Sequence, residues 1–409
     1  MQFLIKRDIL LKSLSLVQGI IEKKNTLPIL SNVLLEVKNG KLFIIATDLD
    51  LVFYDEISEI NIDKEGATTT SATILYDILR KISSNSEVKF EMKSENKLNL
   101  LTDNSDFNLL CLPTDNFPNF EDDFVNNEIS FNKSKFLSLL NKTKISISND
   151  DTRHYLNGVY LHLTESQNRT YLTGVATDSH RLSSSSVEVE SGTIFTSIIL
   201  PKKTVFQLCN LLIDTNEKVL IQTSESKIQF KIGKSKLISK VIDGKFPDYK
   251  KVVPSGNDKI LTVISSDFTQ AIERVITVSL DRKEGVKLII GKDNIKFSVN
   301  STNSGEGNEV IKSNFTGEEM TVSFNSKYLT DIVSEVEDKN LKINLKDPIS
   351  PVLIEDMSDK NSYYVVMPMK IWLNYLILFF YKFDLKSLQL LTNFNLKICF
   401  ISYRMKKMI

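Results

Sequence analysis

The chain has 409 residues, 42% of them hydrophobic, and its 51 Lys and Arg residues balance its 51 Asp and Glu residues. This length predicts two or three domains, and zero net charge argues against a protein that coats nucleic acid through bulk positive charge. The three cysteines form neither a metal-spaced cluster nor a disulfide framework, and no signal-peptide core follows Met1, so we expect a cytoplasmic protein with no metal site and no cofactor.

Hydrophobic periodicity predicts a helix near the start of the chain, where Leu10, Leu14 and Val17 share one face. The turn at Asn39-Gly40 predicts a hairpin, and Ser71 is a good N-cap for a second helix. The first elements expected in chain order are helices over 7–18 and from 72, and strands at 33–37, 42–46, 87–92, 97–101 and 107–112.

The same order of elements recurs further along the chain. Apolar residues again share one face in each predicted helix, and Pro201 is a favoured first-turn residue. The later elements expected are helices over 133–143, from 201, over 267–278 and over 326–336, and strands at 159–163 and 170–176.

Two unrelated short patterns recur at nearly one spacing. Ala176-Thr177-Asp178 repeats Ala46-Thr47-Asp48, and the difference in residue number is 176 − 46 = 130. Phe246-Pro247-Asp248-Tyr249 echoes Phe117-Pro118-Asn119-Phe120, and here the difference is 246 − 117 = 129. A shared spacing indicates duplication of a whole domain, and such repeats usually act through shape and symmetry.

A third, fainter copy follows, because Ser71, Pro201 and Asn325 each open a similar helix. The chain is therefore predicted to hold three copies of one α+β domain, with helices on one side of antiparallel sheets. The predicted domains cover residues 1–126, 127–254 and 255–371, followed by an apolar extension over 372–409.

Basic residues recur on the predicted helices, among them Arg80, Lys81, Lys142, Lys202 and Lys203. On a single helix such residues are most often an ordinary solvated face. Recurrence in equivalent places of a repeat favours one shared positive surface, which would contact phosphates without reading sequence.

Five separated motifs resemble the family of bacterial DNA polymerase III beta subunits, the sliding clamps. The resemblance covers about residues 1–371, in order and with matching spacing. The motifs are Thr26-Leu27-Pro28-Ile29-Leu30, Tyr155-Leu156-Asn157-Gly158, Ala176-Thr177-Asp178-Ser179-His180-Arg181-Leu182, Asp243-Gly244-Lys245-Phe246-Pro247-Asp248-Tyr249 and Tyr364-Val365-Val366-Met367-Pro368-Met369.

The resemblance implies the DNA-clamp fold, with three repeated domains per chain and a closed ring of six domains formed by a head-to-tail homodimer. Such a ring encircles double-stranded DNA and confers processivity without catalysis of its own, because it tethers a polymerase near the primer end. The implied partners are DNA, the DNA polymerase III alpha subunit, the delta subunit of the clamp-loader complex, and other polymerases and repair factors with clamp-binding motifs.

The resemblance also implies an apolar groove that holds a partner's short peptide between the second and third domains. Leu, Val, Met and Pro would form the slot, and His180 and Arg181 would be polar handles at its edge. The residues matching this groove are Leu156, Thr177, His180, Arg181, Leu182, Pro247, Tyr328, Val365, Met367, Pro368 and Met369.

Two further sets of residues follow from the same resemblance. Lys24, Arg80 and Lys203 are the expected DNA contacts. At the dimer interface, Thr277 is less apolar than the family pattern, which predicts a ring that opens more easily. The residues matching that interface are Phe107, Leu109, Thr277 and Val278.

Two alternative functions remain open at this stage. An enzyme could use Asp178 and His180 as an acid–base or metal pair, but nothing supplies a second ligand set and no P-loop occurs. A structural repeat protein that never binds DNA would differ from a clamp in its retention on closed circular DNA.

The extension over 372–409 has no counterpart in the family pattern. It opens with the apolar run from Trp372 to Tyr381, which includes the only Trp of the chain. Because it begins where the predicted groove ends, we hypothesise that it packs on or near the groove and weakens partner binding.

Overall fold

The computed structural model describes residues 1–22, 27–120, 124, 128–213, 217–279, 285–301 and 304–369. Lys24, the expected boundary after residue 126 and the extension over 372–409 lie outside the described residues. Within the described ranges, none of the helices has the length and apolar character needed to cross a membrane.

The first domain repeats one unit twice, in which a strand is followed by a helix and then by antiparallel strands. In its second helix, the Ser71 hydroxyl accepts a hydrogen bond from the Ile74 amide at 3.4 Å and caps the N-terminus. Its elements are β1 (Gln2–Lys6), α1 (Arg7–Val17), the 3-10 turn η1 (Pro28–Ser31), β2 (Asn32–Lys38), β3 (Lys41–Thr47), β4 (Leu51–Ile57), β5 (Asn61–Lys64), β6 (Gly66–Ser71), α2 (Ala72–Lys81), β7 (Glu87–Ser94), β8 (Lys97–Leu101), β9 (Asp106–Leu112) and η2 (Thr114–Asn116).

The second domain has the same order of strands and helices. The Asn132 side chain caps its first helix by accepting from the backbone amides of Ser134 and Lys135. Its elements are β10 (Glu128–Phe131), α3 (Lys133–Lys144), η3 (Asp151–Leu156), β11 (Gly158–Ser166), β12 (Arg169–Thr177), β13 (Arg181–Val189), β14 (Ile198–Pro201), α4 (Lys202–Ile213), β15 (Val219–Thr223), β16 (Lys227–Ile232), β17 (Ser235–Lys240) and η4 (Tyr249–Val252).

The third domain repeats the order once more. Asn325 caps its second helix, which confirms the helix start predicted there, although the helix ends at Val333 and not at Val336. Its elements are β18 (Lys259–Ile264), α5 (Ser265–Val275), η5 (Ile276–Val278), β19 (Gly285–Ile290), β20 (Asn294–Ser301), β21 (Gly305–Lys312), β22 (Asn314–Phe315), β23 (Met320–Asn325), α6 (Ser326–Val333), β24 (Asn340–Leu345), β25 (Val352–Asp356) and β26 (Ser362–Val366).

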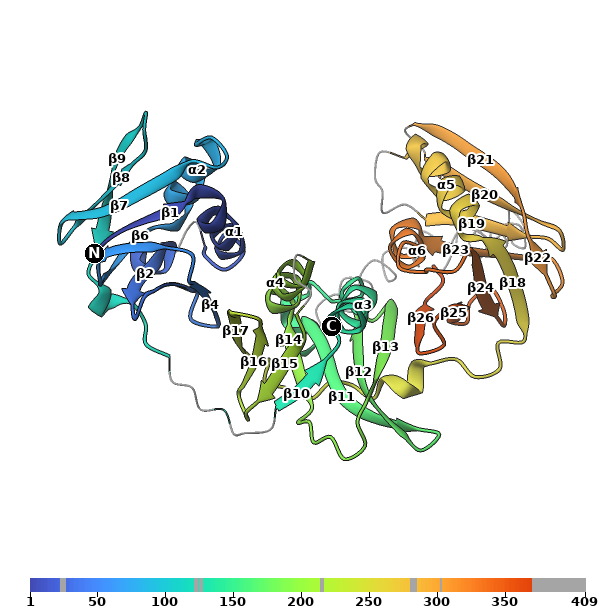
Figure 1. Ribbon diagram of the computed structural model, residues 1–409. Helices are drawn as coiled ribbons and strands as arrows, with labels where there is room; N and C mark the ends of the chain where they lie inside the picture. Colours follow the sequence, from blue (N-terminus) through green and yellow to red (C-terminus); the bar gives the residue numbers. More distant parts are fainter. Residues whose placement is uncertain are drawn as a thin grey trace, which may run out of the picture.

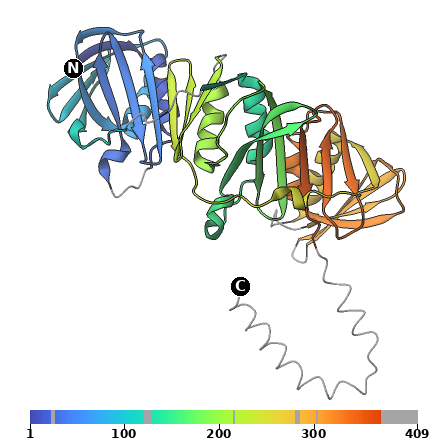
Figure 2. The ribbon, with the colours of Figure 1, turned by 90° about the horizontal axis from the view of Figure 1, so that it is seen from below.

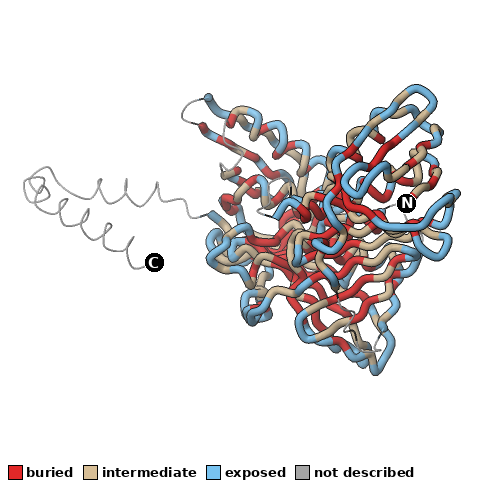
Figure 3. The backbone as a smooth tube through the Cα atoms, turned by 90° about the vertical axis from the view of Figure 1, so that its left-hand side faces the viewer, coloured by how far each residue is buried: buried red, intermediate tan, exposed pale blue. Residues whose placement is uncertain are grey.

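The three domains form an arc with helices inside and strands outside. Helices α1 to α6 lie along the concave side, and the view from below shows strands covering the outer wall (Figures 1 and 2). Buried residues follow the strands and the inward faces of the helices, as an amphipathic helix packed on a sheet requires (Figure 3). This arrangement confirms the predicted fold class.

Two sheets run from one domain into the next. Strand β4 pairs with β17 in a 13-stranded sheet that joins the first and second domains, here called junction 1–2. Strand β13 pairs with β26 in a 9-stranded sheet that joins the second and third domains, here called junction 2–3. Both pairings are antiparallel, so backbone hydrogen bonds connect the domains directly.

The two junctions are equivalent under the internal repeat. Leu51 begins β4 and pairs with Ser239, whereas Arg181 begins β13 and pairs with Val366. The numbers of the two strand starts differ by 181 − 51 = 130, the same difference as between Asp48 and Asp178. One mode of edge-to-edge pairing is therefore used twice in the chain.

A buried lysine adds an ionic connection at junction 2–3. The Lys142 side chain on α3 is 3% exposed, and its Nζ lies 2.8 Å from Asp359, 3.3 Å from Glu337 and 3.7 Å from Asp356. Burial opposes the charge of Lys142, but these carboxylates outweigh burial and raise its pKa. The prediction that Lys142 lies on an exposed helix face is therefore wrong.

We expect Lys142→Met to lower the free energy of unfolding by about 3 kcal/mol, because it leaves the buried Asp356 and the partly buried Asp359 without their cation. Thermal and chemical unfolding would measure the loss, and limited proteolysis would locate it between the second and third domains. Lys135→Met, at an exposed position on the same helix, is the matched control. Equal stability of the two variants would contradict this reading of the junction.

Candidate functional site

The predicted groove residues from the second and third domains meet at junction 2–3. Leu182 on β13 pairs directly with Val365 on β26, and both belong to one apolar cluster with Leu156. All three side chains are at most 3% exposed. They therefore form the floor of the site, not its accessible walls.

The turn from β12 to β13 shapes one rim. The Asp178 carboxylate accepts hydrogen bonds from the backbone amides of His180 and Arg181, each at 2.9 Å. The Thr177 hydroxyl donates to the Arg181 carbonyl oxygen at 2.7 Å and accepts from the Ser179 amide. Ser179 has a φ of 77°, a left-handed conformation that costs a residue with a side chain more than it costs glycine. The His180 side chain is left exposed at this rim.

Arg181 connects the rim to the third domain. Its guanidinium lies 3.1 Å from Asp178 and 2.8 Å from Asp331 on α6, and 4.4 Å from the centre of the Tyr328 ring. Burial, followed by the charge of Asp178, raises the pKa of Tyr328. With 8% exposure and these partners, Arg181 acts as an internal bridge between domains, whereas the sequence predicted a polar handle at the edge.

The end of the third domain forms the opposite rim. The Met367 amide donates to the His180 carbonyl oxygen at 2.8 Å, and the Met369 amide donates to the Ser323 carbonyl oxygen at 2.7 Å. The side chains of Met367 and Met369 are 42% and 43% exposed. Main-chain bonds thus fix this segment while two adaptable thioether side chains remain accessible beside Pro368.

Pro247 lies next to this cluster on the link between the second and third domains. It is exposed, and the neighbouring Phe246 stacks on Tyr160 at 4.9 Å. The buried Tyr249 hydroxyl lies 3.1 Å from His162 Nε2, and burial raises the pKa of Tyr249. The link is therefore held against the second domain by aromatic packing, and Pro247 lies between two members of the apolar cluster, Phe246 and Tyr249.

Sequence reasoning missed Asp331, the acidic partner of Arg181. No local motif marks it, because it follows Arg181 by 150 residues. Its pairing depends on a contact between domains, which hydrophobic periodicity cannot report.

The predicted DNA contacts Arg80 and Lys203 differ in their surroundings. Arg80 is exposed near the end of α2, with Asp77 at 3.5 Å. Lys203 on α4 crosses junction 1–2, where its Nζ lies 2.5 Å from Asp48 and donates to the Ile20 carbonyl oxygen at 2.7 Å. Lys203 therefore holds two domains together, and any DNA contact would share its ammonium group with Asp48.

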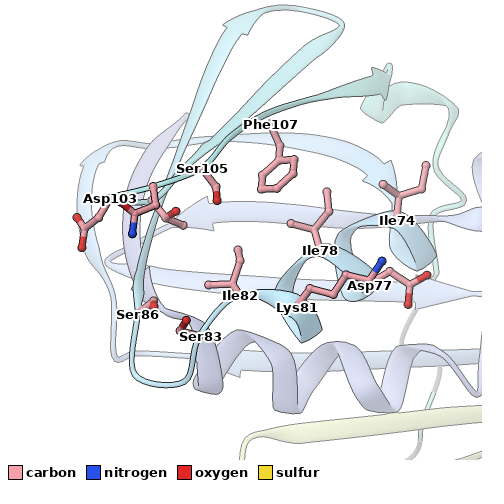
Figure 4. Close-up of a pocket in the computed structure, with 12 residues that line it drawn as sticks. Ile74, Asp77, Ile78, Lys81, Ile82, Ser83, Ser86, Asp103, Ser105 and Phe107 are labelled. Atoms are coloured by element: carbon pink, nitrogen blue, oxygen red, sulfur yellow. The ribbon is translucent and has the colours of Figure 1, made fainter.

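The predicted interface residues lie at opposite ends of the arc. Phe107 and Leu109 lie on β9 of the first domain, and Thr277 and Val278 lie in η5 of the third. Beside β9, a hollow of about 630 Å³ is lined by Ile74, Ile78, Ile82 and Phe107 (Figure 4). One chain does not bring the two pairs together.

Comparison with family models matches all three domains. The N-terminal domain of the DNA polymerase III beta subunit matches residues 1–121, its central domain 130–248 and its C-terminal domain 250–370. Among curated proteins, the beta sliding clamp of Caulobacter vibrioides is 36% identical over 373 residues, which are 91% of this chain and all of the relative. The beta sliding clamp of Escherichia coli K12 is 32% identical over 371 residues, again 91% of this chain and all of the relative.

Solved structures give the same result. A DNA polymerase III subunit beta sliding clamp from Bartonella birtlesii, bound to griselimycin, is 37% identical with a TM-score of 0.86 and covers 91% of this chain and 100% of that one. The beta sliding clamp of Caulobacter crescentus, with polyethylene glycol bound, is 36% identical with a TM-score of 0.86 and covers 91% of this chain and 99% of that one.

We expect Arg181→Lys to reduce the hydrogen-exchange protection of the α6 amides by about tenfold. A lysine is a point charge that cannot hold Asp178 and Asp331 together, and a hydrogen bond to a charged group contributes about 1.5–3 kcal/mol. Arg169→Lys, in an exposed ion pair with Glu188, should leave the same amides unchanged. Unchanged α6 protection in Arg181→Lys would show that the bridge does not hold the two domains.

Proposed function

The chain belongs to the family of bacterial DNA polymerase III beta subunits, the beta sliding clamps, and we propose specific surfaces through which it performs the clamp function. As a member of this family it is a non-catalytic processivity factor in DNA replication. Its partners are DNA, the polymerase and a second copy of itself. The proposals concern how the ring closes, which residues face DNA, and where partners bind.

Ring closure uses the two strand edges that are equivalent to those at the junctions but have no partner domain within the chain. At junctions 1–2 and 2–3, a strand in the position of β4 or β13 pairs with a strand in the position of β17 or β26. In the third domain, the strand equivalent to β4 and β13 is β21. In the first domain, the strand equivalent to β17 and β26 is β9.

Both of these strands have a free edge within the described residues. Strand β21 is the end strand of its sheet. Strand β9 pairs with β8 along one edge, and on the other edge it pairs with β6 only at Cys111 and Leu112. The earlier part of that second edge is therefore free. Head-to-tail pairing of β21 with the partner's β9, here called the ring seam, covers both edges.

The hollow beside β9 supports this seam. At junction 1–2 the α4 side chains Thr204 and Leu208 are at most 1% exposed. Their equivalents in the first domain are Ile74 and Ile78 on α2, which line the hollow, and Ile74 is 52% exposed (Figure 4). A second copy would bury Ile74 and Ile78, whose equivalents Thr204 and Leu208 are already buried within one chain.

Thr277 and Val278 suit the other side of the seam. Helix α5 begins at Ser265 and α1 at Arg7, so Val278 corresponds to Ile20, whose carbonyl oxygen accepts from Lys203 across junction 1–2. The Thr277 hydroxyl donates to the Arg274 carbonyl oxygen of its own helix. Thr277 can therefore be buried at the seam without an unpaired donor.

The concave helices form the DNA-facing surface. Two arcs joined head to tail would surround a central hole with the helices on its inner side (Figure 1). Arg80, Lys203 and Lys24 remain the proposed DNA contacts. Contacts of this kind are independent of sequence and can stay weak, because a closed ring holds DNA by topology.

The site at junction 2–3 is the proposed partner groove. Exposed Met367 and Met369 beside an apolar floor suit a short peptide with a Leu or Phe anchor. Such peptides would come from the DNA polymerase III alpha subunit, from the delta subunit of the clamp loader, and from other polymerases and repair factors, all in the cytoplasm. The pairing of Leu182 with Val365 is the observation that best supports the assignment.

After loading by its clamp loader and ATP, the protein should stay on nicked circular DNA through gel filtration in high salt. Cutting the circle should release it, because retention is topological and not ionic. Release by salt from the uncut circle, or retention on the linear product, would contradict the ring.

Met367→Asp should weaken binding of a fluorescent clamp-motif peptide by at least about tenfold, because a carboxylate would enter an apolar slot. Fluorescence anisotropy gives the dissociation constant, and the dimer should remain intact. Ile194→Asp, at a 73% exposed apolar position elsewhere in the second domain, is the control. Equal affinity of both variants for the peptide would place its site elsewhere.

A further inference from the structure

Each in-chain junction contains a polar pair at the same place. At junction 1–2, the Ser235 hydroxyl donates to the Asp55 carboxylate at 2.7 Å. At junction 2–3, the hydroxyls of Ser362 and Ser185 are hydrogen-bonded to each other at 2.9 Å. Ser185 and Ser362 are directly opposed across their two strands, and the register of β4 with β17 places Asp55 opposite Ser235. At both junctions one side contributes a serine, and the other side contributes the oxygen atom that shares a hydrogen bond with it.

The repeat assigns the third partner of such a serine to Glu309. Strands β4, β13 and β21 begin at Leu51, Arg181 and Gly305, and Asp55, Ser185 and Glu309 each lie at the same distance from the start of their strand. Asp55 accepts a second hydrogen bond from Ser13 on α1, the first helix of its domain. Glu309 likewise accepts from the first helix of its own domain, α5. The two carboxylates thus occupy equivalent environments.

The repeat assigns the third serine to Ser105. The two in-chain serines, Ser235 and Ser362, begin β17 and β26, and the numbers of Ser235 and Ser105 differ by 235 − 105 = 130, the repeat spacing. The Ser105 carbonyl oxygen accepts a hydrogen bond from the Thr102 amide at the start of the β8–β9 pairing. The equivalent residues of the second domain, Ile232 and Ser235, pair where β17 begins its pairing with β16. All three equivalent positions are therefore serines, and Ser235 shows that such a serine can donate to a carboxylate.

Arg274 holds Glu309 in place within one chain. Its Nε lies 3.1 Å and 2.9 Å from the two carboxylate oxygens, and its second nitrogen Nη2 lies 2.5 Å from the first of them. The hydrogen bond from Arg274 lowers the pKa of Glu309. An ionised carboxylate has about four acceptor positions, so it can bind a further hydroxyl while Arg274 stays bound.

The next pair of residues on the same face of the two strands combines a small residue with a large one. The same register that opposes residues 309 and 105 opposes Gly307 to Phe107. A Cβ atom added at Gly307 would lie 2.9 Å from the Val275 carbonyl oxygen and 3.2 Å from Val278. Val275 and Val278 therefore take the place of a side chain at position 307, and the partner's Phe107 would lie against Val278 with no opposing side chain, as small Ser183 faces large Tyr364 at junction 2–3.

We propose that Glu309 accepts a hydrogen bond from the partner's Ser105 at the ring seam, and that Arg274 is the positioning residue for this contact. The proposal rests on the ring proposed above and adds the residues that set its register. A slip of one residue would turn Phe107 to the opposite face of the sheet. The polar pair thus selects the register in which Phe107 lies opposite Gly307.

Disulfide trapping tests the register. Directly opposed residues in antiparallel strands have Cα atoms about 4.5–5.5 Å apart, which suits a disulfide. In a Cys399→Ser background, S105C with E309C should give a covalent dimer under mild oxidation. S105C with N308C and S105C with V310C are the shifted controls and should give at most about a tenth of that yield. Equal or higher yield from a shifted pair overturns the register.

Ring lifetime on circular DNA tests the hydrogen bond itself. Ser105→Ala and Glu309→Ala should each shorten it by at least about tenfold, and the double variant should be no worse than either single one. Glu318→Ala, an exposed residue away from the seam, is the control for lost charge. If the effects of Ser105→Ala and Glu309→Ala multiply, the two residues act independently and the proposed pair is overturned. If both variants match Glu318→Ala and the ring lifetime is normal, the clamp function stands and the pair is overturned.

A third comparison tests the role of Arg274. Arg274→Met should shorten the ring lifetime, and Arg274→Lys should recover at least half of the loss. Neither change should matter in a Glu309→Ala background, because Arg274 acts through that carboxylate. An Arg274→Met effect that persists without Glu309 overturns the positioning role. A chain that is monomeric and loads no ring even without substitutions overturns both this proposal and the ring.

Discussion

The pairing of one domain's sheet edge with the next domain's edge is the constraint on which the structure depends. An unpaired strand edge exposes backbone donors and acceptors, and the domains of this chain meet through such edges. Junctions 1–2 and 2–3 satisfy four of them by one repeated antiparallel contact. Because every domain presents the same two kinds of edge, the chain ends with one edge of each kind, and head-to-tail association follows.

Both proposed working surfaces would be consequences of this pairing. The proposed partner groove lies where β13 meets β26, so its apolar floor exists only while the second and third domains are joined. The proposed pore surface consists of helices that the same sheets hold on the concave side (Figure 1). Ionic bridges strengthen both junctions, Lys203 with Asp48 at the first and Arg181 with Asp331 at the second. Several basic residues thus stabilise domain contacts, which is compatible with zero net charge.

The sequence predicted the parts of the fold that local patterns encode. Hydrophobic periodicity located helices such as α2, and Ser71 marked its start. Strands β4, β13, β17 and β26 were not predicted, although they form the junctions. Their pairing partners lie in other domains, and β13 contains four consecutive serines that hide strand periodicity.

The groove was predicted through family motifs and not through chemistry. Leu156, Leu182 and Val365 read equally well as ordinary core residues, and the structure buries them. Arg181 was expected at the edge of the groove. Its ion pair with Asp331 was missed because the two residues are 150 positions apart and no local pattern marks the contact. Contacts between domains are therefore the part of the site that required the structure.

Native mass spectrometry combined with solution X-ray scattering tests the ring most directly. The account predicts a single species of twice the 46.6 kDa chain mass, with a scattering profile that shows a central hole. A monomer, or open chains that grow with concentration, would mean that the free edges of β9 and β21 do not close on each other.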